Sequence, residues 1–222
     1  MTRRGVRGVA IAALIAWALA AHAAPPLREA EMASCLPGEM STWGDGQDRA
    51  AIAGSVRLVY HPAGAPPQFS EAPVRQALQR AATAWSACGV PGVLVDAAAA
   101  PADAVQVRWD DTATQGNFAL ADLGQRRLWL SKAMFDLLAQ RNPTFPAGET
   151  LQMAISHEMG HFFGLMAHSH RCIDVMSYYH DGRGHTCTTR DGRSYKSVPE
   201  YRALLPTACD IARCRALNGK SP

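Results

Sequence analysis

The stretch that decides the fold reads HEMGHFFGLMAH and runs from His157 to His168. It opens with the pattern H-E-x-x-H. An α-helix turns by about 100° per residue, so His161 lies about 40° around the helix from His157 and one turn further along. Two imidazoles on one helix face can share one metal ion, and Glu158 is close enough to reach a water on that ion. The pattern therefore predicts a hydrolytic metal centre carried by a helix.

H-E-x-x-H is a short pattern, and chance alone produces it in about one chain in a hundred of this composition. Its simplest alternative is an amphipathic helix with two exposed histidines. Three features downstream favour the metal centre. Gly164 follows His161 by three residues, where glycine allows the positive φ of a helix stop. A third histidine, His168, comes soon after, and Met176 follows within Asp174-Val175-Met176-Ser177-Tyr178.

Together these features resemble the metzincin metalloproteases, whose pattern is H-E-x-x-H-x-x-G-x-x-H followed by a turn that contains methionine. In this chain Ala167 stands at the expected third position, and His168 lies one residue later. A small bulge in the non-helical linker can absorb one residue. The distance from His168 to Met176 also resembles that of the matrixin branch. We therefore expect His168 to be the third Zn²⁺ ligand, with His170 and Asp174 as rivals.

The resemblance also implies roles for the neighbouring residues. Glu158 would be the general base that takes a proton from a zinc-activated water. Met176 would form the apolar floor under the site without binding the metal. Tyr178 matches the Met-x-Tyr of the astacin and serralysin branches, where the tyrosine can contact zinc or the transition-state oxyanion.

The resemblance implies an α+β, metzincin-like fold with a twisted mixed sheet of about five strands, and the patterns in the rest of the chain agree with α+β. Alternating or apolar runs predict strands, and apolar residues at helical spacing predict a long first helix and a short later one. The active-site helix is expected to start near Glu149 or Thr150, with Leu151, Ile155, Met159 and Phe162 as its buried stripe. Capping-box patterns start at Ser197 and Thr207, the second before a final helix. The expected strands are 55–60, 93–95, 104–109, 117–123 and 126–130, and the expected helices are 74–87, 132–140 and 208–217.

Residues 1–23 have the pattern of a signal peptide. Arg3, Arg4 and Arg7 precede an apolar run of about a dozen residues, which is too short to span a membrane. Ala21-His22-Ala23 is an A-x-A cleavage signal. We expect an exported chain, secreted or periplasmic, with no stable membrane anchor after cleavage. The predicted divisions are 1–23 signal peptide, 24–54 N-terminal extension and 55–222 catalytic domain.

Charge and size set limits on the partners. Three of the 22 basic residues and none of the 19 acidic residues lie in 1–23, so the mature chain is close to neutral. A near-neutral chain gives no indication of a nucleic-acid partner. About 200 residues suffice for one domain with its own core. We expect a monomer that acts on a protein or peptide substrate.

Six cysteines in an exported chain imply disulfides, with fifteen possible pairings. Cys172 lies between His168 and Met176, so a bridge from it would brace the metal site, and Cys187 is its nearest partner in sequence. Cys209 and Cys214 would point about 140° apart on a helix, which disfavours a bond between them. Cys35 could hold the enzyme latent by binding zinc as a thiolate, but a plain disulfide is the better interpretation.

These observations predict a zinc-dependent endopeptidase. Two alternatives come from other classes: an inactive zinc-containing binding protein at the cell surface, and an amidase that acts on cell-wall peptides. Glu158 disfavours the first, because a protein that only binds does not need a general base.

Overall fold

The computed structural model describes residues 26–194 and 200–220. It has an α+β architecture around one five-stranded mixed sheet, in the order β2-β1-β3-β5-β4. The strands β1, β2, β3 and β5 run parallel, and β4 pairs antiparallel with β5 at the edge. The strand bounds are β1 Val56–Tyr60, β2 Gly92–Val95, β3 Val105–Trp109, β4 Ala119–Asp122 and β5 Arg127–Leu130.

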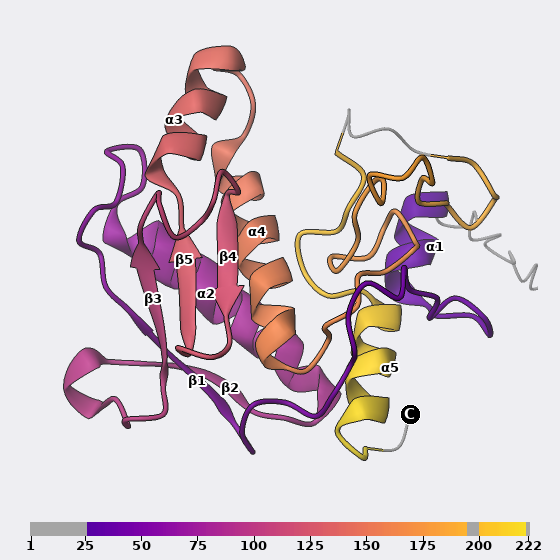
Figure 1. Ribbon diagram of the computed structural model, residues 1–222, viewed down its shortest axis with the longest axis horizontal. Coiled ribbons are helices and arrows are strands. Elements are labelled where there is room, and N and C mark those ends of the chain that lie inside the picture. The colour runs from indigo at the N-terminus through magenta and orange to yellow at the C-terminus, as the bar shows by residue number, and fades with distance from the viewer. Residues whose placement is uncertain (1–25, 195–199, 221–222) are drawn as a thin grey trace, which may run out of the picture.

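Two helices, α2 and α4, pack against each other and against the sheet. In Figure 1, α2 passes behind the strands and α4 runs beside β4, while α1 and α5 belong to a loop-rich part beyond α4. None of the helices within 26–194 and 200–220 is long and apolar enough to cross a membrane. The helix bounds are α1 Leu27–Ala33, α2 Glu71–Trp85, α3 Lys132–Arg141, α4 Ala147–Phe162 and α5 Ala208–Leu217, with short 3₁₀ turns at Ser86–Cys88 and Ala97–Ala99.

The expected strands and helices are present, with shifted ends. The first long helix starts at Glu71 instead of Val74, so Pro73 lies in its first turn. Proline is tolerated there because the first N–H groups of a helix have no partner within it. Strand β4 is shorter than the expected 117–123, since the amide of Asn117 turns back to the carbonyl of Thr114. Helix α1 was not expected from the sequence.

The predictions for the two ends of the chain concern two capping boxes and the signal peptide. The capping box at Thr207 is confirmed: its side chain accepts from the amide of Asp210, and the Asp210 side chain accepts from the amide of Thr207. The pattern at Ser197 and the signal peptide lie outside the described residues.

Helix α4 is held rigidly where it carries the site. Its predicted stripe of Leu151, Ile155, Met159 and Phe162 is buried, as expected. The indole N–H of Trp85, on α2, donates to the carbonyl of Ser156 at 2.9 Å. A helix fixed on its inner side by packing and hydrogen bonding can present side chains on its outer side in a defined geometry.

Two of the three disulfides lie within the loop-rich part, and the third joins α5 to the turn that follows α2. They join Cys35 to Cys209, Cys88 to Cys214 and Cys172 to Cys187. The expected bridge from Cys172 to Cys187 is confirmed, and Cys209 and Cys214 bond elsewhere, as predicted. Cys35 is part of a disulfide and so is not a free thiol. Three disulfides indicate an oxidising environment.

Candidate metal centre

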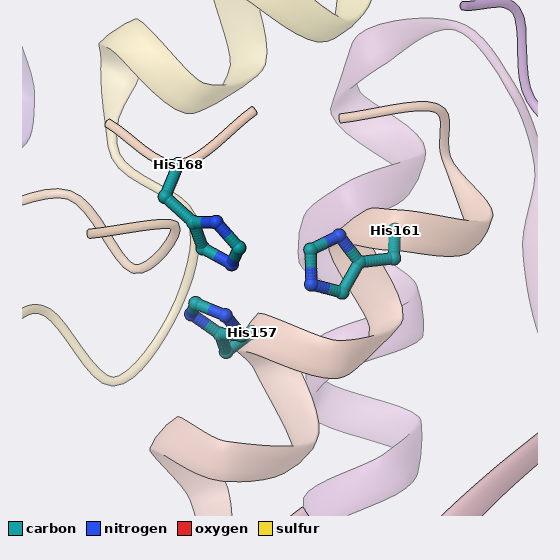
Figure 2. A group of neighbouring side chains, drawn as sticks. All are labelled: His157, His161 and His168. Atoms are coloured by element: carbon teal, nitrogen blue, oxygen red, sulfur yellow. The ribbon is translucent and has the colours of Figure 1, made fainter. Parts of the chain in front are cut away.

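Three histidines meet at one place in the described structure. His157 and His161 come from consecutive turns of α4, and His168 comes from the loop that follows it. One ring nitrogen from each lies within 4.8 Å of the other two. Figure 2 shows the three rings around a common space, with His157 and His168 on one side and His161 facing them from the other. The sequence-predicted ligand set is therefore brought together.

The hydrogen bonds at Nδ1 fix the orientation of each ring. Nδ1 of His157 lies 2.7 Å from the carbonyl oxygen of Val175, and Nδ1 of His161 lies 2.7 Å from that of Leu165. A carbonyl oxygen only accepts, so each Nδ1 carries the proton and each Nε2 keeps a free lone pair. Nδ1 of His168 lies 2.7 Å from a carboxylate oxygen of Asp45, with the same consequence.

These residues fit a zinc ion. Nε2 of His168 is buried and has no hydrogen-bond partner among the described residues. An unpaired buried acceptor is costly, and a metal ion bound at Nε2 of His168 would remove that cost. Three neutral imidazoles with one side open form the ligand set of a catalytic zinc site.

The histidines are neutral without any metal. Burial lowers the pKa of His157 well below its usual value and that of His161 to about 4, and the neighbouring rings add to both effects. Burial also lowers the pKa of His168, although Asp45 opposes this. Neutral imidazole is the form that binds a metal ion, so protons do not compete with zinc near neutral pH.

The structure explains how His168, one residue later than the metzincin spacing, reaches the other two histidines. Gly164, at φ +104°, ends the helix where the carbonyl of Arg49 leaves no room for a side chain. The chain then turns, and the amide of Ser169 donates to the carbonyl of Met176 at 2.7 Å. This bond anchors the loop to the methionine turn and places His168 opposite α4.

Neither rival for the third position joins the group. The ring of His170 packs edge-on against Trp43, with their centroids 4.1 Å apart. The carboxylate of Asp174 is buried and accepts hydrogen bonds from the hydroxyls of Ser169, at 2.5 Å, and Thr207, at 2.7 Å. A second group of possible ligand atoms, at Cys35, Glu39 and Cys209, is engaged in a disulfide and is not a metal site.

Glu158 lies beside the three nitrogens. Its Oε2 is 3.9 Å from Nε2 of His161 and accepts a hydrogen bond of 2.8 Å from the amide of Ala121 on β4. Burial raises the pKa of Glu158 to about 8 in the metal-free structure, against the lowering effect of that amide. The bond to Ala121 therefore fixes the carboxyl group beside the ring nitrogens.

Met176 and Tyr178 both lie near the three histidines. Met176 is fully buried, and its sulfur lies so close to Gly160 that a side chain there would collide with it. The ring of Tyr178 stacks on His168, with centroids 3.7 Å apart and planes 22° apart, and 40% of the residue is exposed. Burial of its hydroxyl raises the pKa of Tyr178 to about 12, so the phenol is protonated at neutral pH.

The site opens into a cleft of about 390 Å³ between β4 and the loops beyond α4. The residues Asn117 to Ala121 line one wall, and Tyr178 and Arg202 line the other. Arg202 was not expected at the site from the sequence, because the only pattern near it was the capping box that starts at Ser197. It pairs with Glu200 at 2.9 Å and lies over the ring of Tyr179. Burial alone would lower the pKa of Arg202, but its contacts with Glu200 raise it overall.

Comparisons with known proteins do not assign a family. No family model matches the chain, and no curated protein matches it. A chain of the solved structure titled "GM1 bound form of the ECX AB5 holotoxin" is similar to this one, with 12% sequence identity and a TM-score of 0.48. The likeness covers 84% of this chain and 92% of that chain. At that score it supports no conclusion about function.

Proposed function

We propose that this protein is an exported zinc-dependent endopeptidase of the metzincin type. One observation carries the proposal: ring nitrogens of three histidines converge beside the partly buried carboxyl group of Glu158, and all four residues line one cleft. A metal centre with a general base and room for a substrate is what metal-assisted hydrolysis requires.

The edge strand supports a peptide as the substrate. β4 pairs with β5 on one side, and its other side faces α4 and the cleft. An extended peptide can add to such an edge through main-chain hydrogen bonds, which gives affinity without demanding a particular sequence. The site lies at the same edge, because Glu158 bonds to the amide of Ala121. A peptide along β4 would therefore pass over the three histidines.

Each residue then has a chemical task. Zinc, when bound, supplies Lewis acidity that polarises a carbonyl group and acidifies water. Nε2 of His157, His161 and His168 would hold the ion. Glu158 would accept a proton from the attacking water and deliver it to the nitrogen of the leaving amine. The hydroxyl of Tyr178, protonated at neutral pH, would donate to the carbonyl oxygen as its negative charge develops.

The two alternative functions share the metal centre. A binding protein without activity would not need a carboxyl group whose position is fixed beside the ring nitrogens, so Glu158 favours the enzyme. An amidase that acts on cell-wall peptides would use the same residues on a different substrate. Cleavage of a peptide library compared with cleavage of purified peptidoglycan stem peptides separates the two enzymatic functions.

The decisive variant is Glu158→Gln. It removes the proton acceptor and keeps the size and shape of the side chain, so zinc content and fold should remain while peptide cleavage falls by at least about a hundredfold. Glu71→Gln is the matched control, since Glu71 is an exposed glutamate in the first turn of α2, away from the cleft. Equal cleavage by wild type and Glu158→Gln would refute the proposed mechanism.

A further inference from the structure

The third histidine is supported differently from the other two. His157 and His161 belong to a helix, and each donates its Nδ1 proton to a backbone carbonyl. His168 lies in a loop, and a carboxylate holds it at two points. Oδ1 of Asp45 accepts from the backbone amide of His168 at 2.9 Å, and Oδ2 accepts from its Nδ1 at 2.7 Å.

This double contact sets two properties of the ligand. The bond to the amide fixes the backbone of His168, and the bond to the ring fixes its rotation and its tautomer. A carboxylate behind a metal-binding imidazole also makes Nε2 a stronger donor, because its negative charge stabilises positive charge on the ring. Carbonyl oxygens, which carry no net charge, provide less of this effect at His157 and His161.

Asp45 belongs to the segment Trp43–Asp48, which we call the strap, and contacts at both ends of the strap hold it in place. At one end of the strap, the amide of Trp43 donates to the carbonyl of His168 at 2.9 Å. At the other end, Oδ1 of Asp48 accepts from the amides of Met166 and Ala167 at 2.8 and 2.9 Å. The strap therefore follows the ligand loop on both sides of Asp45.

Two further contacts anchor the strap to the rest of the protein. Arg213, on α5, pairs with Asp48 at 2.7 Å. Within the strap, Gly46 lies against the carbonyl of Met166 so closely that any side chain would collide with it. The strap thus has one docked position, and that position puts a carboxylate behind the third histidine.

We propose that Asp45 is a positioning residue of the metal centre, and that the third ligand binds zinc at full strength only when the strap is docked. The inference rests on the proposed zinc site. It assigns a function to the N-terminal segment, which the sequence suggested was only an extension of the catalytic domain. Asp45 contacts no substrate in this proposal and acts through His168.

Zinc affinity of full-length mature variants tests the proposal. Asp45→Asn and Asp45→Ala should each bind zinc about 10–100-fold more weakly than wild type in competition with a chromophoric chelator, as for other carboxylates behind metal-binding histidines. Asp181→Asn is the matched control. Asp181 also holds a histidine, with its Oδ2 2.7 Å from Nδ1 of His185, and both Asp45 and Asp181 line the same cavity of about 500 Å³. His185 is not part of the metal group.

The outcomes separate the two proposals. A wild-type protein that binds no zinc refutes the proposed function itself. A wild-type protein that binds zinc, with Asp45→Asn within twofold of it, refutes only the role of Asp45. Weaker binding by Asp45→Asn together with unchanged binding by Asp181→Asn supports that role, provided that the metal-free variants unfold at the wild-type temperature.

A measurement on the wild-type protein covers the case in which the variants do not fold. Nitrogen-15 NMR of the histidine side chains distinguishes the two ring nitrogens. The zinc-loaded protein should show a proton on Nδ1 of His168 that is protected from exchange with solvent, because Asp45 accepts it. A proton that exchanges as fast as that of His185, or an unprotonated Nδ1, would overturn the proposal.

Discussion

Oε2 of Glu158 lies 2.8 Å from the amide nitrogen of Ala121, so the edge strand and the proposed general base are joined by one hydrogen bond. Ala121 pairs with Leu128 across the sheet, but its amide points away from β5 and into the cleft. The strand that would bind the substrate therefore also positions the carboxyl group that would activate water.

The first prediction removes that amide. Ala121→Pro deletes the N–H, and an edge position whose amide takes no part in the sheet tolerates proline. We expect kcat for peptide cleavage to fall on the order of tenfold, because the carboxyl group of Glu158 loses the hydrogen bond that fixes its position, with little change in zinc affinity. Ala121→Gly keeps the amide and is the control. Unchanged kcat in Ala121→Pro would mean that the bond does not position the base.

The second prediction concerns Tyr178. Tyr178→Phe keeps the ring that stacks on His168 and loses only the hydroxyl. If that hydroxyl stabilises the oxyanion, kcat should fall on the order of a hundredfold while KM and zinc affinity change little. Steady-state kinetics on one fluorogenic peptide measures both constants. A fall in zinc affinity with kcat preserved would show that Tyr178 supports the ligand and takes no part in the reaction.

The third prediction distinguishes the loop histidines. His168→Ala should weaken zinc binding by more than about a hundredfold and abolish cleavage. This loss exceeds the one expected when a residue that only hydrogen-bonds to a ligand is replaced. His170→Ala should change zinc binding only slightly, because its ring packs on Trp43, outside the metal group. Zinc titration of the two metal-free variants measures this. The reverse order would make His170 the ligand, in conflict with the structure.

The fourth prediction is a pH dependence of stability. Burial, together with the neighbouring Asp210 carboxyl, raises the pKa of Asp174 to about 7. The pKa of an aspartate in the unfolded chain is about 3.9, so the folded state binds this proton more tightly. The contribution of Asp174 to stability is then complete below about pH 4 and is lost as the pH rises to about 7.

Denaturant unfolding with intact disulfides, in the presence of a chelator, measures this effect. Between about pH 4 and pH 7 the unfolding free energy of wild type should fall relative to that of Asp174→Asn, which has no proton to lose at this position. The chelator removes the separate pH dependence of zinc binding. A constant difference between the two proteins across that range would show that the carboxyl group of Asp174 titrates normally.

The sequence predicted the parts of the site that lie on one regular element. His157, Glu158 and His161 share a helix, so their mutual arrangement follows from the geometry of the helix alone. The buried stripe of α4 was predictable for the same reason. The position of His168 could be inferred only by resemblance, because the path of its loop depends on Gly164 and on the bond from Ser169 to Met176.

The residues that support the site from a distance in sequence could not be predicted. Asp45 lies more than a hundred residues before His168, in a loop with no periodic pattern, and reaches it only through tertiary contacts. Arg202 enters the cleft from a segment in which the sequence indicated only a capping box. One partial signal was present: Gly44 and Gly46 flank Asp45, and glycines around an acid indicate a close approach of the backbone, but not to which partner.

The most direct test of the central claim is peptide cleavage measured as zinc is returned to the metal-free mature protein. Activity should be absent without metal, rise in proportion to added zinc and level off at about one equivalent per chain, because three histidines form one catalytic site. Full cleavage by protein shown by elemental analysis to contain no transition metal, or no cleavage of any peptide by protein holding one zinc, would contradict it.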